Sequence, residues 1–216
     1  MLTAQAAFFM HAAFSRLSSL ERDEYQLLPK HFETAAKILE SDATTPPDIK
    51  RVATSLGSFI GDVRETTGAA ASPRVICVCA AALRAADVAR AFAPVKCGVA
   101  KLFAKHFKVR ADNTHLRQLH QQTDLRRSAL QEAEQAEYLR TSKAKVAVGT
   151  PHRLHRLCAA GALRLQAMTL LIIDTKPDVK GATIFDQAPL RDSLVAWYRE
   201  LLHPLVISGQ VKMCFV

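Results

Sequence analysis

Residues 145–154, KVAVGTPHRL, place a short apolar run directly before a turn and the start of a helix. The run is typical of a buried strand, and Pro151 suits the first turn of a helix, where its missing N–H would have no partner. The free N–H groups of that turn, the Thr150 hydroxyl and the Arg153 guanidinium could together meet one phosphate. The alternative is an ordinary capped helix start with a surface arginine. The stretch therefore predicts a strand–turn–helix unit, with or without an anion contact.

Comparable apolar runs lie on both sides of this unit. They occupy residues 75–79 (VICVC), 96–104, 169–174 (TLLIID) and 211–216 (VKMCFV). Helical segments are expected between the runs, at residues 81–92, 112–138 (one long polar helix or a helix pair), 151–160 and 186–202. Alternating strands and helices imply right-handed crossovers. We therefore predict an α/β fold with a single open, mostly parallel sheet flanked by helices.

The first third of the chain is helical in pattern and slightly acidic. Ser18 and Glu21 have capping-box spacing, so we expect a helix that begins there and stops at Pro29. Further helices are predicted at residues 31–39 and 49–63, a packing or docking helix at 1–17, and a linker at 68–73. The predicted organisation is a helical N-terminal region (1–68) and a sheet domain (69–216) with a polar helical insertion at about 113–142.

Positive charge is concentrated in one part of the chain. Residues 74–166 hold 17 Lys/Arg against 6 Asp/Glu, whereas residues 1–73 hold 7 against 9 and residues 167–216 hold 5 against 5. A basic block of this kind indicates a polyanionic partner, and the alternative is a solvated basic face.

The cysteines and the apolar runs exclude several classes of protein. Five cysteines without CxxC spacing predict reduced thiols, with Cys77 and Cys79 sharing one buried strand face. No apolar run approaches the ~18 residues of a membrane helix, so we expect no membrane partner. His152 and His155 share a helix face but lack two further ligands for zinc, and we expect neither a metal nor a cofactor.

The carboxyl ends of the strands form the working edge of an open parallel sheet. In this arrangement Asp174 and several polar or basic side chains meet at that edge, and the expected RNA contacts are Arg84, Lys101, Lys105, His106, Lys108, Thr150 and Arg153. The alternative for the lysines is a basic strand edge that prevents edge-to-edge pairing.

From about residue 47 onward, the order of elements resembles the first core domain of DEAD-box RNA helicases, whose sheet is of the RecA type. Arg84 matches the arginine of a PTREL-type motif, Thr150–Arg153 resembles TPGR with His152 in place of glycine, and LLIID at 170–174 resembles the strand before the DEAD box. Thr175 stands where the catalytic glutamate would follow, no GK[ST] loop occurs, and neither the SAT motif nor the second core domain is present. We therefore expect a non-enzymatic protein with no small-molecule substrate.

KLFAKHFKV at 101–109, GTPHR at 149–153, LSSLERDEYQLLP at 17–29 and the terminal VKMCFV resemble the Cms ribosomal small-subunit protein family. The resemblance implies a DEAD-like, ATPase-deficient factor of the nucleolus, in the small-subunit processome (90S pre-ribosome). Its implied partners are pre-ribosomal RNA and processome proteins, and its implied role is non-catalytic RNA binding and scaffolding in ribosome biogenesis. The charged N-terminal tail that is common in the family is missing.

Two other functions are compatible with the residues. One is a protein–protein adaptor that uses the fold without touching RNA. The other is a divergent NTPase in which Asp174 would hold a metal-bound water.

Overall fold

The computed structural model describes residues 2–33, 52–53, 70–95, 97–104 and 114–216. Parts of the predicted helices at 31–39 and 49–63 lie outside this set. The described strands are β1 (Val75–Val78), β2 (Val99–Leu102), β3 (Val146–Gly149), β4 (Leu170–Ile173) and β5 (Lys212–Phe215). The helices that position them are α1 (Leu2–Phe14), α2 (Ser19–Glu24), α5 (Ala82–Ala91), α6 (Thr114–Thr141), α7 (Pro151–Ala159), α8 (Ala188–Trp197) and α9 (His203–Ile207). Short 3-10 turns lie at η1 (Pro29–His31) and η3 (Ala93–Val95), and a π-helical turn at η4 (Tyr198–Leu202).

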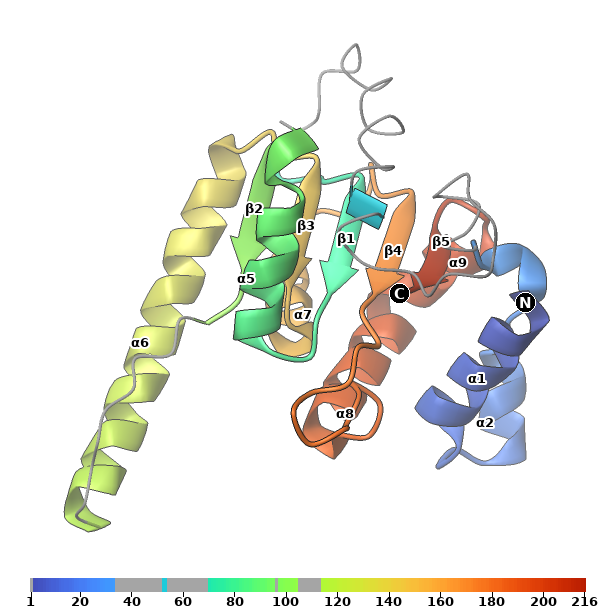
Figure 1. The fold of residues 1–216 in the computed structure, drawn as a ribbon, viewed down its shortest axis with the longest axis horizontal. Coiled ribbons are helices and arrows are strands. Elements are labelled where there is room, and N and C mark those ends of the chain that lie inside the picture. Colours follow the sequence, from blue (N-terminus) through green and yellow to red (C-terminus); the bar gives the residue numbers. More distant parts are fainter. Residues whose placement is uncertain (1, 34–51, 54–69, 96, 105–113) are drawn as a thin grey trace.

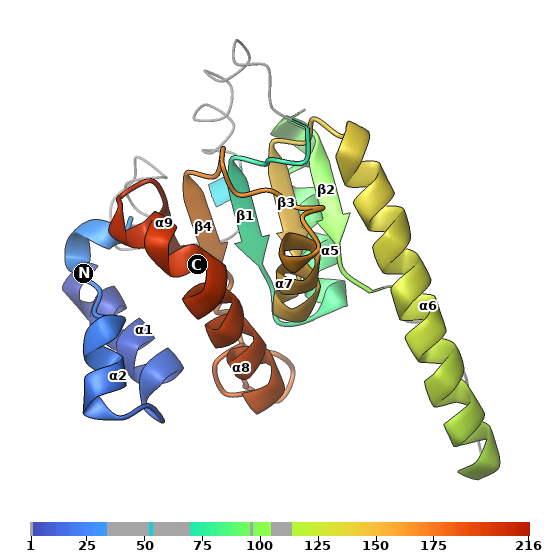
Figure 2. The ribbon, with the colours of Figure 1, turned by 180° about the vertical axis from the view of Figure 1, so that it is seen from behind.

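The described strands form one parallel sheet in the order β2-β3-β1-β4-β5. β1 lies at the centre, between β3 and β4, which both come later in the chain. α5 covers one face of the sheet, and α7 and α8 cover the other (Figures 1 and 2). The predicted open parallel α/β sheet is therefore confirmed.

β1, β3 and β4 are buried on both faces, which explains their unbroken apolar sequences, whereas the edge strand β2 exposes Lys101. Val75, Cys77 and Cys79 point to the core under α5, whereas Ile76 and Val78 point to the larger core under α7 and α8. The predicted alternation that puts Cys77 and Cys79 on one face is confirmed.

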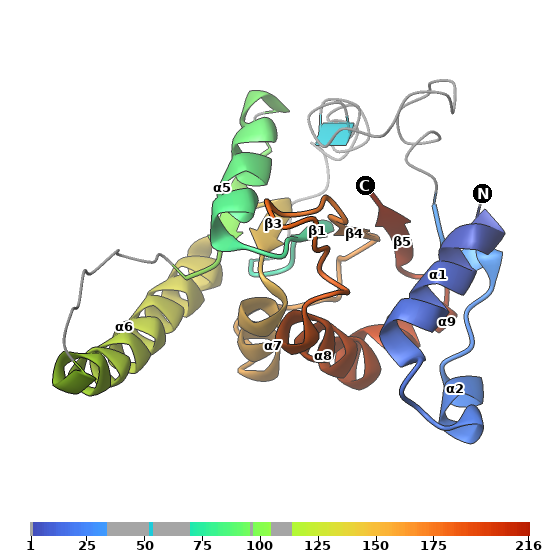
Figure 3. The same cartoon turned by 60° about the horizontal axis from the view of Figure 1, so that its bottom comes forward.

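α1 packs into the larger core rather than standing apart. Phe9 and Phe14 are fully buried, and their rings contact each other and Tyr198 at centroid distances of 5.2–5.8 Å. Figure 3 shows α1 beside the α8–α9 side of the sheet domain. The first residues of the chain thus form a packing helix, as predicted.

Local sequence rules explain the boundary of α2. The Ser18 hydroxyl accepts a hydrogen bond from the Glu21 N–H, and the Glu21 carboxylate accepts one from the Ser18 N–H. This capping box confirms the predicted helix start, although the helix ends at Glu24, before Pro29.

Two predicted helices differ in the structure. The helix expected from His31 does not form in its described part, because Phe32 makes a parallel bridge to Met213 and extends the sheet beyond β5. The helix expected at 186–202 ends as an α-helix at Trp197 and widens into η4, followed by Pro204. Proline has no N–H to donate back to Glu200, so the regular ladder cannot continue there.

The predicted linker at 68–73 is ordered where it is described. Ala71, Ser72 and Pro73 are buried. The Ala71 N–H donates to the Ser142 carbonyl at 3.2 Å, and the Ser72 hydroxyl accepts from the Ala167 N–H at 2.9 Å. These hydrogen bonds join the approach to β1 to the loops before β3 and β4.

α6 is one continuous helix of 28 residues, the long polar helix that the sequence predicts. Its second half lies beside β2 and α7, and its first half extends past the end of the sheet (Figure 1). Leu139, buried in the main core, and a set of polar contacts attach its described second half to the domain, and the polar contacts involve the predicted site.

Candidate nucleic-acid interface

The carboxyl end of the sheet joins Arg84 on α5 to Asp174, which directly follows β4. Arg84 Nε donates to Asp174 Oδ2 at 2.6 Å and Arg84 Nη2 donates to Oδ1 at 2.9 Å. The Asp174 side chain is 3% exposed and that of Arg84 is 23% exposed. Hydrogen bonding to Asp174 raises the pKa of the Arg84 guanidinium. Both carboxylate oxygens are therefore occupied by a fixed cation.

The Thr150–Arg153 turn forms where the sequence places it. Thr150 precedes α7 in an extended conformation, Pro151 occupies the first turn, and the Leu154 N–H donates to the Thr150 carbonyl at 3.0 Å. The Thr150 hydroxyl makes no capping hydrogen bond. His152 is exposed at the surface, although partial desolvation of its ring lowers the pKa of the imidazole.

Arg153 points away from solvent toward α6. Its Nη1 donates to the Ser128 carbonyl at 3.2 Å and to Gln135 Oε1 at 3.4 Å, and its Nη2 donates to Ser128 Oγ at 2.9 Å. The side chain is 4% exposed, and desolvation lowers the pKa of its guanidinium. A phosphate contact by Arg153 stays a prediction, and it would require release of these partners.

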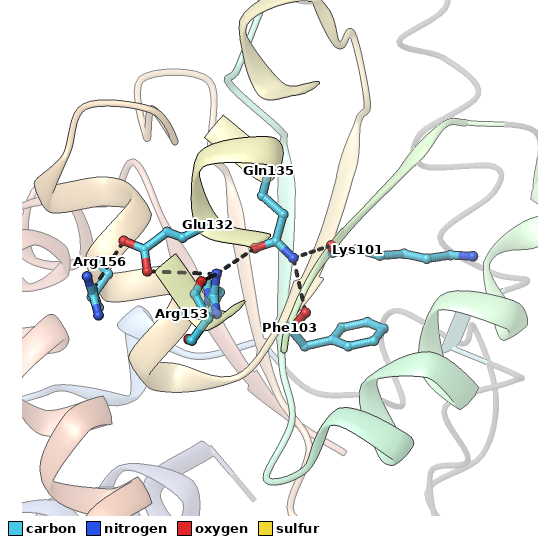
Figure 4. A network of polar contacts seen from close by, with 7 residues as sticks. Lys101, Phe103, Glu132, Gln135, Arg153 and Arg156 are labelled. Carbon is cyan, nitrogen blue, oxygen red and sulfur yellow. Dashed lines mark hydrogen bonds and ion pairs between the residues drawn. The ribbon is translucent and has the colours of Figure 1, made fainter. Parts of the chain in front are cut away.

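Glu132 of α6 ties two arginines of α7 together. Its Oε2 lies 3.7 Å from Arg153 Nη1 and its Oε1 lies 3.1 Å from Arg156 Nε. Gln135, one turn later, donates from Nε2 to the carbonyl oxygens of Lys101 at 3.3 Å and Phe103 at 3.0 Å. Figure 4 shows Glu132 and Gln135 joining α7 to β2. We call Glu132, Gln135 and Arg153 the α6 clamp.

Lys101 is the described lysine of the KLFAKHFK stretch. It lies on β2 at the edge of the sheet and its side chain is exposed. In Figure 4 that side chain points away from the α6 clamp. The other predicted contacts of this stretch, Lys105, His106 and Lys108, lie outside the described residues.

Sequence reasoning missed the partners of the two arginines. Arg84 and Asp174 are 90 positions apart, and the partners of Arg153 lie on an insertion that resembled a solvated helix. The one usable signal was Glu132, an acid within the basic block, but its position facing α7 depends on how α6 packs.

No group of three or more potential metal-ligating side chains occurs in the described part of the chain. His155 Nε2 instead lies 2.7 Å from Glu200 Oε2. Among the described helices, none is long and apolar enough to cross a bilayer.

Comparison with known proteins finds the family that the sequence motifs resemble. Residues 15–123 match the model of the CMS1 family, described as a U3-containing 90S pre-ribosomal complex subunit. Protein CMS1 of Chaetomium thermophilum is 36% identical over 106 residues, which are 48% of this chain and 33% of that protein. The chain thus spans about a third of the length of this relative.

Among solved structures, one that contains S. cerevisiae Dbp5 and ADP is similar to this chain, with a TM-score of 0.45 and 15% identity. The similarity covers 76% of this chain and 33% of the other. The family match extends over half of the chain, across the α2 capping box, β1, α5 and β2. The chain belongs to the CMS1 family of U3-containing 90S pre-ribosomal complex subunits.

Proposed function

We propose that this chain is a non-catalytic RNA-binding and scaffold factor in assembly of the small ribosomal subunit, acting in the 90S pre-ribosome of the nucleolus. Its partners would be pre-ribosomal RNA and proteins of the small-subunit processome. The observation that carries the non-catalytic part is the Arg84–Asp174 pair, which occupies both oxygens of the acid that follows β4.

Phosphoryl transfer depends on groups that hold phosphates and a metal ion. A carboxylate that serves this purpose binds a metal or its water, whereas Asp174 is 3% exposed and each of its oxygens accepts a hydrogen bond from Arg84. The sequence also has no GK[ST] loop, and Thr175 rather than glutamate follows Asp174. These features support a fold retained for binding rather than for ATP turnover.

RNA contact is supported by the basic block at 74–166 and by Lys101, whose exposed ammonium lies on the edge strand. Phosphate contacts by lysine and arginine make affinity fall with salt, with a log–log slope of about −0.7 per contact on single strands. Fluorescence anisotropy with a labelled single-stranded RNA should show this dependence. Lys101→Gln should reduce the slope by about 0.7, whereas Lys180→Gln, on an exposed loop, should not change it. Affinity that is independent of salt would refute the proposal.

A protein–protein adaptor is the second candidate, and a specific observation favours it. Arg84 and Arg153, two of the expected RNA contacts, bind acidic or polar groups of the protein itself. Crosslinking within purified pre-ribosomal particles separates the two functions. RNA crosslinks near Lys101 support RNA binding, and protein crosslinks alone at this edge support the adaptor.

A further inference from the structure

Besides Lys101, the described part of the basic block has cations without an ion pair at the amino edge of the sheet, opposite the predicted site. At the carboxyl edge, Arg84 is bound to Asp174, and Arg153 and Arg156 are bound to Glu132. At the amino edge, Arg74, Lys143 and Arg164 make no ion pair with any described residue. We call these three residues the amino-edge patch.

Backbone hydrogen bonds bring the loops of the amino-edge patch together. The Ala71 N–H donates to the Ser142 carbonyl at 3.2 Å, and the Ala71 carbonyl accepts from the Arg164 N–H at 2.8 Å. The Arg74 N–H donates to the Lys145 carbonyl at 2.9 Å, and the Arg74 carbonyl accepts from the Thr169 N–H at 2.9 Å. Loops that precede β1, β3 and β4 thus form one joined surface, and its three cations come from three different loops.

The described loops of this edge carry side-chain charge of one sign. Residues 70–74, 142–145 and 160–169 contain no aspartate or glutamate. Lys143 and Arg164 are exposed and Arg74 is half-buried. Arg74 Nε has no hydrogen-bond acceptor in the described structure. An edge with this charge attracts polyanions and repels cations.

The apolar residues of these loops are directed inward. Leu163 and Met168 are 2% and 0% exposed, and no large exposed hydrophobic side chain occurs in the described loops of this edge. Protein interfaces of appreciable affinity have an apolar core, whereas contacts with a phosphate backbone need mainly arginine and lysine on a firm support. The chemistry therefore favours a phosphate backbone over an acidic protein segment.

We propose that the amino-edge patch is an RNA phosphate-binding surface, separate from the helicase-like carboxyl edge. This inference rests on the proposed RNA-binding function and assigns it a second surface. RNA would contact the loops before β1, β3 and β4 without displacing the Arg84–Asp174 pair or the α6 clamp.

The test compares two double variants of the full chain with the same change in net charge. Lys143→Gln with Arg164→Gln removes the two exposed cations of the patch, and Arg16→Gln with Lys30→Gln removes two exposed cations of the N-terminal helical part. Binding of labelled single-stranded RNA is measured by anisotropy over a range of salt. Loss of two phosphate contacts should lower the log–log slope by about 1.4 and weaken binding about tenfold at physiological salt. The control should keep both the slope and the affinity of the unmodified chain.

The outcomes separate this inference from the function on which it rests. If the unmodified chain binds RNA and the two double variants bind equally well, the amino-edge patch is refuted and the proposed function stands. If the unmodified chain does not bind RNA even at low salt, the proposed function itself fails. If poly-glutamate competes as well as RNA does and the patch variant loses both, the surface binds acidic polymers in general, which also overturns the assignment to RNA.

Discussion

Arg84 reaches from α5 to both carboxylate oxygens of Asp174, and this pair closes the centre of the sheet at its carboxyl end. Because Asp174 is 3% exposed, loss of its partner would leave a charge in a place that water scarcely reaches. The pair therefore connects α5 to the end of β4, in addition to binding the Asp174 carboxylate.

Arg84→Ala should destabilise the protein by about 3 kcal/mol, since removal of one partner leaves a buried charge uncompensated. Urea unfolding gives the comparison with Arg90→Ala on the same helix. Arg90 pairs with Asp87 at the surface, where both side chains are more than half exposed, so its loss should cost below about 0.5 kcal/mol. Equal losses in the two variants would show that the Arg84–Asp174 pair contributes no more than a surface pair.

Arg153→Ala should loosen the second half of α6, because Glu132 and Ser128 lose the buried guanidinium that holds them. Hydrogen exchange should become faster in residues 128–141 and change little in β1 and β4. Arg140→Ala is the matched control, since Arg140 bonds Glu137 on the exposed side of the same helix. Unchanged exchange in α6 would mean that Gln135 and apolar contacts suffice to hold the helix.

Gly149→Ala should be poorly tolerated, because a methyl group there would overlap the Leu102 carbonyl oxygen and lie 2.9 Å from Leu154 Cδ2. Overpacking of this kind typically costs about 1–3 kcal/mol, and a rigid backbone neighbour puts this site at the upper end. Gly161 has a φ of +68° but open space around it, so Gly161→Ala should cost only about 1 kcal/mol of backbone strain. Thermal unfolding should show the larger fall in Tm for Gly149→Ala.

His31 should make stability depend on pH. Burial lowers the pKa of its imidazole below the usual value of about 6.5, so the unfolded chain binds the proton more readily than the folded one. The contribution of His31 is thus complete above about pH 6.5 and is lost as the pH falls through the folded-state pKa. His31→Asn, whose oxygen can replace Nδ1 as acceptor for the Leu28 N–H, should flatten the pH dependence of the unfolding free energy below pH 6.5.

The control for this prediction is His11→Asn on the exposed face of α1, which should leave the curve unchanged. If His31→Asn does not flatten the curve, the loss of stability at acid pH comes from other groups. Candidates are His152 and His203, whose pKa values are also lowered by desolvation.

The sequence predicted the sheet well because its signals are local. Unbroken apolar runs such as VICV and LLII need only a strand covered on both faces, and Thr150-Pro151 marks a helix start without reference to anything distant. The binding partners of Arg84 and Arg153 could not be predicted in this way. Each depends on which element folds over it, and residue type alone does not distinguish an arginine that meets phosphate from one that meets Glu132 or Asp174.

The positions of Phe32 and of the amino-edge patch could not be predicted for the same reason. The sequence around Phe32 predicts the beginning of a helix, but Phe32 pairs with the strand edge at Met213, which lies far along the chain. Arg74, Lys143 and Arg164 are scattered in sequence and gather only because Ala71 and Arg74 hydrogen-bond to neighbouring loops. The charge count identifies a basic block in the sequence, but not which of its cations pair with acids in the folded chain.

The strand order has a consequence for synthesis on the ribosome. β1 pairs only with β3 and β4 among the described strands, so Val75–Val78 must wait for about seventy further residues before its first sheet partner exists. At about 5–20 residues per second, that interval lasts several seconds. Throughout it, this apolar segment of the future core has no sheet partner, and only chaperones or transient contacts with segments already made can cover it.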